Sequence, residues 1–225
     1  MPRRFIDLST PIRTEHVRWP VERREARSHG DGSYVQASWL GWPVHGFTHM
    51  DAPRHFDADG GTTSDVPLEA CAGPAVVVDV SAVGPDEPVT EALIAGAGAD
   101  VREGDIALIR SAWDTRASID TAEFWTTAPY MTTEASRWLR ARGVKGVGFD
   151  FPQDRCIRDL VTGAREPALE ENVTHVELLL RGVIMFEYLC NMAAIVAPRV
   201  EFFGLPLKVP DCDGAPIRAV AVEDA

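Results

Sequence analysis

The sequence has few cysteines, no long apolar stretch and no excess of positive charge. Its 225 residues include four cysteines without a C-x-x-C pair, which argues against soft tetrahedral cysteine sites and predicts free thiols. No stretch approaches the roughly 20 apolar residues of a membrane span, and the N-terminus has no signal-peptide pattern. The net charge is −12, whereas a surface that binds nucleic acid needs a basic stripe. The same charge disfavours binding to anionic membranes. We therefore expect a cytoplasmic protein with neither nucleic acid nor a membrane as its partner.

What the sequence does have is a histidine-rich segment from 43 to 56, PVHGFTHMDAPRHF, which holds three of the six histidines. Imidazole and carboxylate groups are ligands for a borderline divalent cation such as Zn(II) or Mn(II). In a straight strand His45 and His49 would leave the backbone about 13 Å apart, at roughly 3.3 Å per residue. We therefore predict a bent segment in which His45, His49 and Asp51 converge on one cation. A lone histidine is more often a surface or core residue, so the prediction rests on the four candidate ligands, His55 included, taken together.

A second group of candidate residues lies near the C-terminal end. Residues 183–186 read as a buried strand that delivers Glu187 at its end. A buried carboxylate requires a partner, and from the residues alone a cation and an arginine are equally good candidates. His175 lies upstream in a predicted short helix.

Apolar runs and capping signals predict alternating strands and helices in a single domain, 1–225. Strands are expected at 4–8, 34–40, 75–80, 106–110, 144–149 and 183–186, and helices at 89–99, 131–142 and 175–180. Residues 22–33 are expected to form a charged, glycine-bearing loop. The alternation indicates the α/β class.

The spacing H-x-x-T-H-x-D-x-P-x-H resembles the signature of metal-dependent hydrolases called the cyclase family, which include bacterial kynurenine formamidase (arylformamidase) and isatin hydrolase. The family pattern has glycine directly before the threonine, where this chain has Phe47. The resemblance covers nearly the whole chain and is weakest from 13 to 41. It implies a swivelling β/β/α domain with mixed sheets, assembled as a homodimer or homotetramer, with residues 13–41 as a candidate arm between subunits.

The resemblance also implies a ligand set. His45, His49 and Asp51 would hold one metal, and Asp51 would bridge to a second one completed by His175 and Glu187. The last two residues match the twelve-residue spacing of the family. We expect one or two divalent ions, Zn(II) or Mn(II), in each subunit.

By the same resemblance, His55 would stay off the metals and act as a general acid/base. A cation polarises a carbonyl and lowers the pKa of water towards about 7, and a free imidazole can carry the proton. The predicted reaction is hydrolysis of an amide, lactam or N-formyl C–N bond in a small, aromatic substrate. Candidate substrate-binding residues are Phe47, Trp42, Phe56, Trp113 and Arg54.

Two other classes of function remain open. A metal-dependent lyase or cyclase of secondary metabolism would form its product without uptake of oxygen from labelled water. A non-catalytic protein with a structural metal would have no use for His55, because a closed site leaves no open position.

Overall fold

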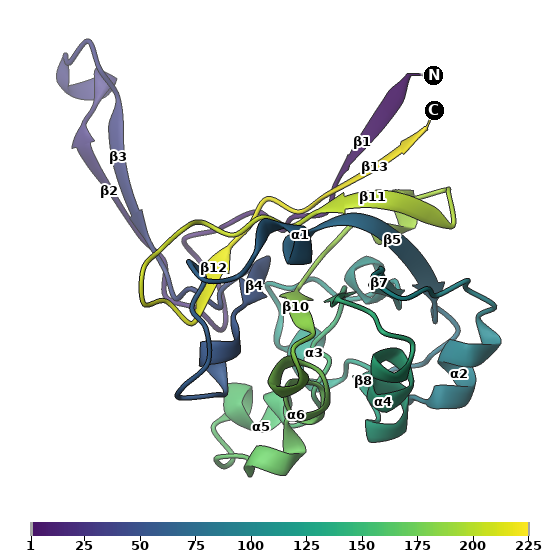
Figure 1. Ribbon diagram of the computed structural model, residues 1–225. Coiled ribbons are helices and arrows are strands. Elements are labelled where there is room, and N and C mark those ends of the chain that lie inside the picture. Colours follow the sequence, from purple (N-terminus) through teal and green to yellow (C-terminus); the bar gives the residue numbers. More distant parts are fainter. Residues whose placement is uncertain (1, 225) are drawn as a thin grey trace.

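Nine strands, the central ones buried on both faces, build one sheet (Figure 1). The structure, a computed structural model, describes residues 2–224. In sheet order the strands are β1 (Arg3–Asp7), β13 (Val220–Asp224), β11 (Arg199–Phe203), β5 (Ala72–Asp79), β7 (Ile106–Arg110), β9 (Gly146–Phe149), β10 (Ile184–Glu187), β4 (His49–Asp51) and β12 (Gly214–Pro216). The central strands β5, β7, β9 and β10 run parallel, and the others pair antiparallel. The predicted α/β class with a mixed sheet is confirmed.

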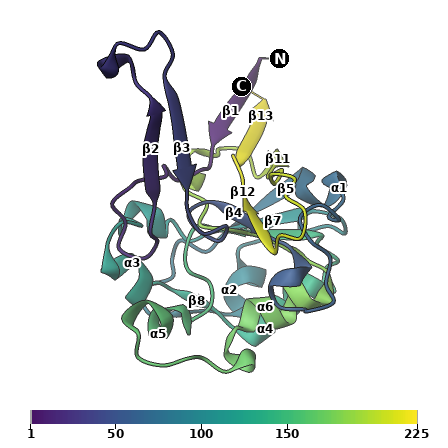
Figure 2. The same cartoon turned by 90° about the vertical axis from the view of Figure 1, so that its left-hand side faces the viewer.

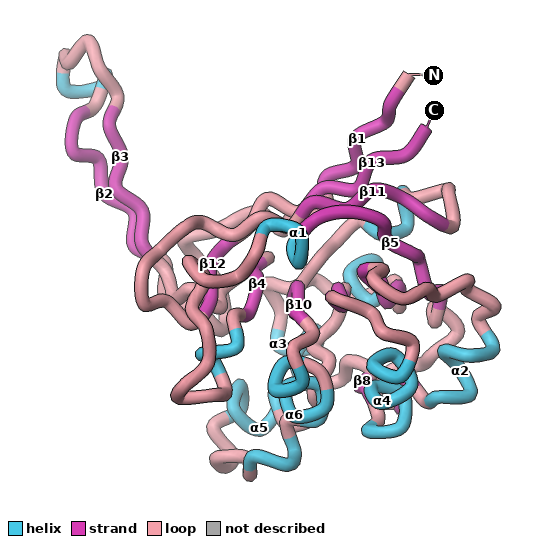
Figure 3. The backbone as a smooth tube through the Cα atoms, in the orientation of Figure 1, coloured by secondary structure: helices cyan, strands magenta, loops and turns pink. Residues whose placement is uncertain are grey.

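The two faces of the sheet carry separate apolar cores. In β5, Val76 and Val78 join one core, whereas Ala75 and Val77 join the other, because successive side chains of a strand point to opposite faces. The second core lies between the central strands and the curled-over strands β1, β11 and β13. The first core is covered by helices α2–α6, which lie on one side of the central strands (Figure 3).

The helices are short. They are α1 (Leu68–Cys71), α2 (Glu91–Gly96), α3 (Ala122–Thr126), α4 (Thr133–Ala141), α5 (Ile157–Thr162) and α6 (Val173–Glu177). Of these, α2 and α4 lie within the predicted helices 89–99 and 131–142 but are shorter than predicted. Thr132 caps α4 by accepting from the backbone N–H of Ala135 over 3.2 Å, and Gly143 follows with φ of 71°. The predicted helix at 175–180 is divided between α6 and a 3-10 turn. No described helix has the length and apolar character needed to cross a bilayer.

A two-stranded hairpin stands apart from the sheet. It pairs β2 (Glu22–Arg27) with β3 (Ala37–Gly41), and Figures 1 and 2 both show it rising from the body. The prediction of a loop over 22–33 is wrong for 22–27, because these charged residues, all exposed, gain cross-strand partners in β3. A smaller pair joins β6 (Pro88–Val89) to β8 (Tyr130–Met131) beside the helices.

Candidate metal centre

Strand pairing places three candidate ligands on the helical face of the sheet. In the antiparallel pair of β4 with β10, Glu187 lies across from His49. The next pair of the ladder, Met50 and Phe186, belongs to the core on the opposite face. Because side chains alternate along a strand, His49, Asp51 and Glu187 all point towards the helices.

The bend that precedes β4 passes through Phe47. Residues 44–48 form a turn and bends rather than a strand, which confirms the predicted bent segment. Phe47 has φ of 60°, in the left-handed region of the backbone that glycine adopts freely. For a residue with a side chain this conformation costs about 1–2 kcal/mol. The ring of Phe47 is 1% exposed and packs against those of His16 and Trp19, with centroids 5.0 Å apart in each case. Burial of the ring thus offsets the backbone strain.

His49 presents one nitrogen to the acidic groups. Its Nδ1 donates to the carbonyl oxygen of Phe47 over 2.8 Å, because a carbonyl oxygen can only accept. In the uncharged tautomer with this donor, the lone pair is on Nε2, which lies 3.2 Å from Oδ1 of Asp51 and 3.7 Å from Oε2 of Glu187. This Nε2 atom and Oδ2 of Asp51 are buried without a hydrogen-bond partner. Buried lone pairs that face one another are stabilised by a cation.

His45 lies between two carboxylates and beneath a second imidazole. Its Nδ1 is 2.7 Å from Oδ1 of Asp51, and its Nε2 is 2.7 Å from Oδ2 of Asp213. Burial opposes protonation, but the two carboxylates outweigh it and raise the pKa of His45 to about 9. The ring of His55 stacks on that of His45 at a centroid distance of 3.8 Å. Burial lowers the pKa of His55 to about 4, so its imidazole is neutral at pH 7 and can accept a proton.

His175 completes the cluster from α6. Its Nδ1 is 2.6 Å from Oδ2 of Asp154, so its Nε2 faces inward, 3.5 Å from Oδ2 of Asp51 and 3.5 Å from Oε1 of Glu187. Glu187 also accepts a hydrogen bond from the amide of Gln153. Burial, reinforced by the charge of Asp51, raises the pKa of Glu187. The partners of the buried Glu187 are therefore imidazoles and an amide, and not an arginine.

These donor atoms fit a divalent cation. Three sets of donors each lie within 4.8 Å of one another: His45, His49 and Asp51; Asp51, His55 and His175; and His45, His55 and Asp213. Asp51 uses Oδ1 towards His45 and His49, and Oδ2 towards His175. A carboxylate whose two oxygens face different histidines is suited to bridge two cations. The geometry admits His55 both as a ligand and as a free base.

A cavity of about 460 Å³ opens onto this cluster. His45, His55, His175 and Glu187 line it on one side. Its apolar and aromatic walls come from Trp19, Phe56, Ile157, Leu160, Pro167, Leu169 and Tyr188. The ring of Phe56, a predicted substrate-binding residue, stacks on His175 at 4.2 Å. The cavity therefore joins aromatic walls to the predicted metal ligands.

Four predicted substrate-binding residues do not line this cavity. Trp113 is buried, and its Nε1 donates to the carbonyl oxygen of Phe124 over 3.0 Å. Phe47 lies in the same core, and Trp42 packs against it. Arg54 is exposed on the surface. Aromatic residues close to a ligand in the sequence pack into the core as readily as towards a site.

Polar residues of the site that are absent from the sequence-based predictions include Asp154, Asp213 and Arg18. Asp154 follows the end of β9, and the ends of strands in α/β sheets commonly carry functional groups. Its position in the sequence could therefore have indicated a role in the site. Asp213 precedes Gly214, where an added Cβ would lie 2.6 Å from Cε1 of His45. Arg18, which also lines the cavity, lies in the region of weakest resemblance and has no comparable signal.

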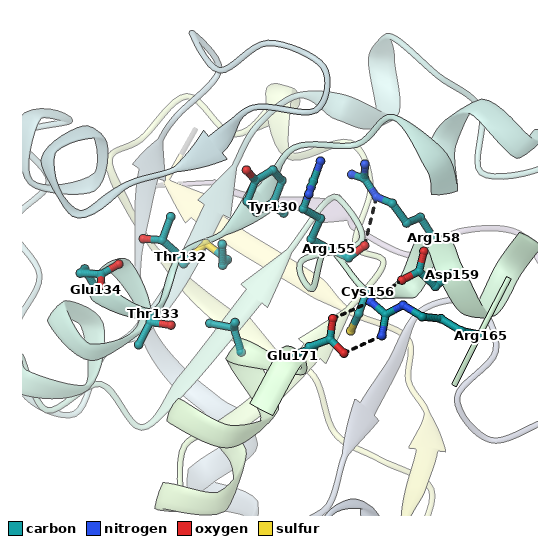
Figure 4. Close-up of a pocket in the computed structure, with 12 residues that line it drawn as sticks. Tyr130, Thr132, Thr133, Glu134, Arg155, Cys156, Arg158, Asp159, Arg165 and Glu171 are labelled. Carbon is teal, nitrogen blue, oxygen red and sulfur yellow. Dashed lines mark hydrogen bonds and ion pairs between the residues drawn. The ribbon is translucent and has the colours of Figure 1, made fainter. Parts of the chain in front are cut away.

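A separate cavity of about 440 Å³ lies at the start of α4 (Figure 4). Its three arginines are all paired with carboxylates: Arg165 with Glu171 and Asp159, and Arg155 and Arg158 with Asp86. Burial raises the pKa of its thiol, Cys156, to about 12, which makes that thiol a poor nucleophile. This cavity therefore offers no evident reactive group.

Comparison with known proteins gives consistent relatives. The family model described as "Putative cyclase" matches residues 6–153. A kynurenine formamidase from Salinibacter ruber is 31% identical over 223 residues, with 96% of each chain covered. The structure of a predicted metal-dependent hydrolase from Bacillus stearothermophilus is 26% identical, with a TM-score of 0.74 and 100% of both chains covered. An isatin hydrolase bound to the product analogue thioisatinate has a TM-score of 0.85 over 99% of this chain and 93% of that one, and at 22% identity it supports the fold alone.

Proposed function

The chain belongs to the cyclase family, and on that basis we propose that it is a metal-dependent hydrolase of a small aromatic molecule. The bond cleaved is the C–N bond of an amide, lactam or N-formyl group. The observation that carries the proposal is a cavity-lining imidazole, His55, beside buried imidazole and carboxylate donors. Relatives named kynurenine formamidase support the same class of reaction.

In this proposal the cluster holds two cations. His45, His49 and Asp51 would hold one, and Asp51, His175 and Glu187 would hold the other. Two buried atoms without a hydrogen-bond partner, Nε2 of His49 and Oδ2 of Asp51, support this assignment. When bound, Zn(II) or Mn(II) supplies a Lewis acid that polarises a carbonyl oxygen and makes water more acidic.

His55 moves the proton. Its side chain is 28% exposed and lines the cavity, so it reaches both water and substrate. Its Nδ1 lies 3.6 Å from Oδ2 of Asp213, which orients the ring and stabilises the imidazolium that forms. The imidazole takes a proton from water and returns it to the leaving nitrogen. The aromatic walls exclude bulk water and position the ring of the substrate.

Metal content tests the ligand assignment. Elemental analysis of protein purified without chelator should give about two equivalents of zinc or manganese, and fewer in His49→Ala. His29→Ala is the matched control, because His29 is exposed in the loop of the hairpin. About one equivalent in the native chain would remove His175 or Glu187 from the ligand set. No metal in either protein, even after incubation with excess metal, would refute the hydrolase.

Turnover of N-formylkynurenine and isatin in ¹⁸O-labelled water tests the reaction class. A hydrolase places one labelled oxygen in the acid product, because water supplies the new C–O bond. Product that forms without the label would identify a lyase or cyclase instead. The same assay on His49→Ala links the activity to the metal.

We further propose that the hairpin of β2 and β3 is an arm that packs against a second copy of the chain. A free two-stranded hairpin is marginal in water, and Trp39 and Leu40 in β3 are each 43% exposed. Light scattering should give a dimer or tetramer for the native chain and a smaller mass for Leu40→Glu, but not for Leu68→Glu on α1. A native monomer would refute the arm.

The four free thiols support the cytoplasm as the location.

A further inference from the structure

Arg18 lines the same cavity as the metal ligands, from the loop between β1 and β2. Its Nη1 donates to the phenolic oxygen of Tyr188 over 3.0 Å. Its guanidinium carbon lies 4.6 Å from the ring centroid of Trp125 and 5.3 Å from that of Trp19. Cation–π contacts and one hydrogen bond therefore hold the charge at a defined place in the cavity wall.

Arg18 has no acidic partner. Among the described residues no ion pair within 4.0 Å includes it, whereas Arg13, earlier in the same loop, pairs with Asp120 at 3.3 Å. The arginines of the cavity in Figure 4 are likewise paired. The chain has 34 acidic residues against 22 basic ones, so carboxylates are plentiful. Of its five N–H donors, Arg18 uses one on a side chain, which leaves the others for a ligand.

We propose that Arg18 is a specificity-determining residue that binds a carboxylate of the substrate, so that the preferred substrates are aryl amides that carry a carboxylate. A guanidinium matches a carboxylate through two parallel N–H···O bonds. The apolar walls accept the aromatic ring, and a cavity of about 460 Å³ suits a small molecule. The other charged lining residue outside the cluster, Glu166, is exposed on the loop after α5, where water and salt screen it. This inference rests on the proposed hydrolase function.

The test compares each acid with its uncharged ester. The substrates are the three isomeric formamidobenzoates and their methyl esters, assayed with the metal-loaded native protein and with Arg18→Met and Arg18→Lys. For the best isomer, Arg18→Met should lower kcat/KM for the acid by about 10- to 100-fold, mainly through KM. The ester should change by less than about 3-fold, since it has no charge to pair. Arg18→Lys should restore part of the preference, because lysine supplies a point charge without the planar fork.

Arg181→Met is the matched control, because Arg181 is an exposed arginine in the turn after α6. It should leave the acid-to-ester ratio unchanged, and thermal melts of all variants should show that they fold. The inference is overturned if Arg18→Met keeps the native ratio of kcat/KM for the acid to that for the ester. Lowering kcat/KM equally for both substrates is one such outcome.

Equilibrium binding separates this inference from the hydrolase proposal. Formamidobenzoate binding is followed by tryptophan fluorescence, since Trp125 and Trp19 lie beside Arg18. The measurement is made with and without metal, so that any direct contact between the carboxylate and a cation is recognised. Weaker binding to Arg18→Met in both forms supports the inference even if no substrate is turned over, and that absence of turnover counts against the hydrolase alone. Equal binding by both proteins overturns the role of Arg18.

Discussion

The carboxylate of Asp154 holds the imidazole of His175 in one orientation, with Oδ2 2.6 Å from Nδ1. Its other oxygen accepts from the backbone N–H of Thr174 over 2.7 Å, so both oxygens are anchored. With Nδ1 donating to Asp154, the neutral form of the His175 imidazole has its lone pair on Nε2, where a metal would bind. Asp154 thus acts on the candidate centre through His175.

We expect Asp154→Asn to weaken metal binding by about 10- to 100-fold, because a neutral amide orients the imidazole less firmly and makes it less basic. Competition with a chromogenic chelator measures the affinity. Asp159→Asn is the control, since Asp159 pairs with Arg165 in the separate cavity. Native affinity in Asp154→Asn would mean that His175 does not ligate the metal.

Glycine is required at position 214, where β12 passes beside His45. An added Cβ would lie 2.6 Å from Cε1 and 3.0 Å from Nδ1 of the imidazole. We expect Gly214→Ala to displace His45 from Asp51, to lower metal content, and to destabilise the fold by about 1–3 kcal/mol. Gly96→Ala on α2 is the control, because nothing lies within 4 Å of its added Cβ. Elemental analysis and urea unfolding measure both effects. Full metal content in Gly214→Ala would contradict the placement of His45 as a ligand.

His55→Gln separates the two roles that the geometry allows for this residue. Glutamine keeps the approximate size and hydrogen-bonding capacity of histidine but cannot carry the proton. We expect the variant to retain its metal and to lose about 100- to 10,000-fold in kcat. Metal analysis and steady-state kinetics on the same preparation measure both properties. Loss of metal would instead make His55 a ligand, and native turnover would exclude it as the acid/base.

The central sheet was predictable because its strands carry their own signal. Ile106–Arg110 appears at its predicted bounds, since a parallel strand buried on both faces reads as a continuous apolar run. The helices α3 and α5 were not predicted. They have five and six residues and begin without the side-chain cap that marks the start of α2 and α4. The charged strand β2 escaped prediction because its partner is another exposed strand and not the core.

The candidate site was predictable only where one segment carries it. His45, His49 and Asp51 lie within seven residues, so their spacing is visible in the sequence. Asp213 is 168 residues from His45, and only the pairing of β12 with β4 brings it there. The contact of Arg18 with Tyr188 spans 170 residues and likewise depends on tertiary structure.

Asp150 gives the fold a pH dependence that is independent of the metal cluster. Its side chain is fully buried at the end of β9. Burial raises the pKa of Asp150 to about 7, although Ser111 and Ala112 donate three hydrogen bonds to the carboxyl group. An unfolded aspartate has a pKa of about 3.9, so between about pH 4 and pH 7 the folded state binds the proton and the unfolded state does not. The stability that this carboxyl contributes is therefore complete below about pH 4 and declines as pH rises to about 7.

Asp150→Asn should remove this slope, because the amide does not titrate. At every pH the variant should be less stable by a constant amount of about 1–3 kcal/mol in the free energy of unfolding. The reason is that its NH₂ group, a donor, faces either the N–H of Ala112 or the donors of Ser111. Urea unfolding of both proteins at several pH values from 4 to 7.5 measures the difference in the free energy of unfolding, in which titrations common to both proteins cancel. The native chain should exceed the variant in free energy of unfolding by a margin that shrinks as pH rises. The decrease should be up to roughly 4 kcal/mol, at 1.36 kcal/mol per pKa unit. A difference that stays constant over this range would mean that Asp150 is ionised in the folded state throughout, with its charge held by Ser111 and Ala112.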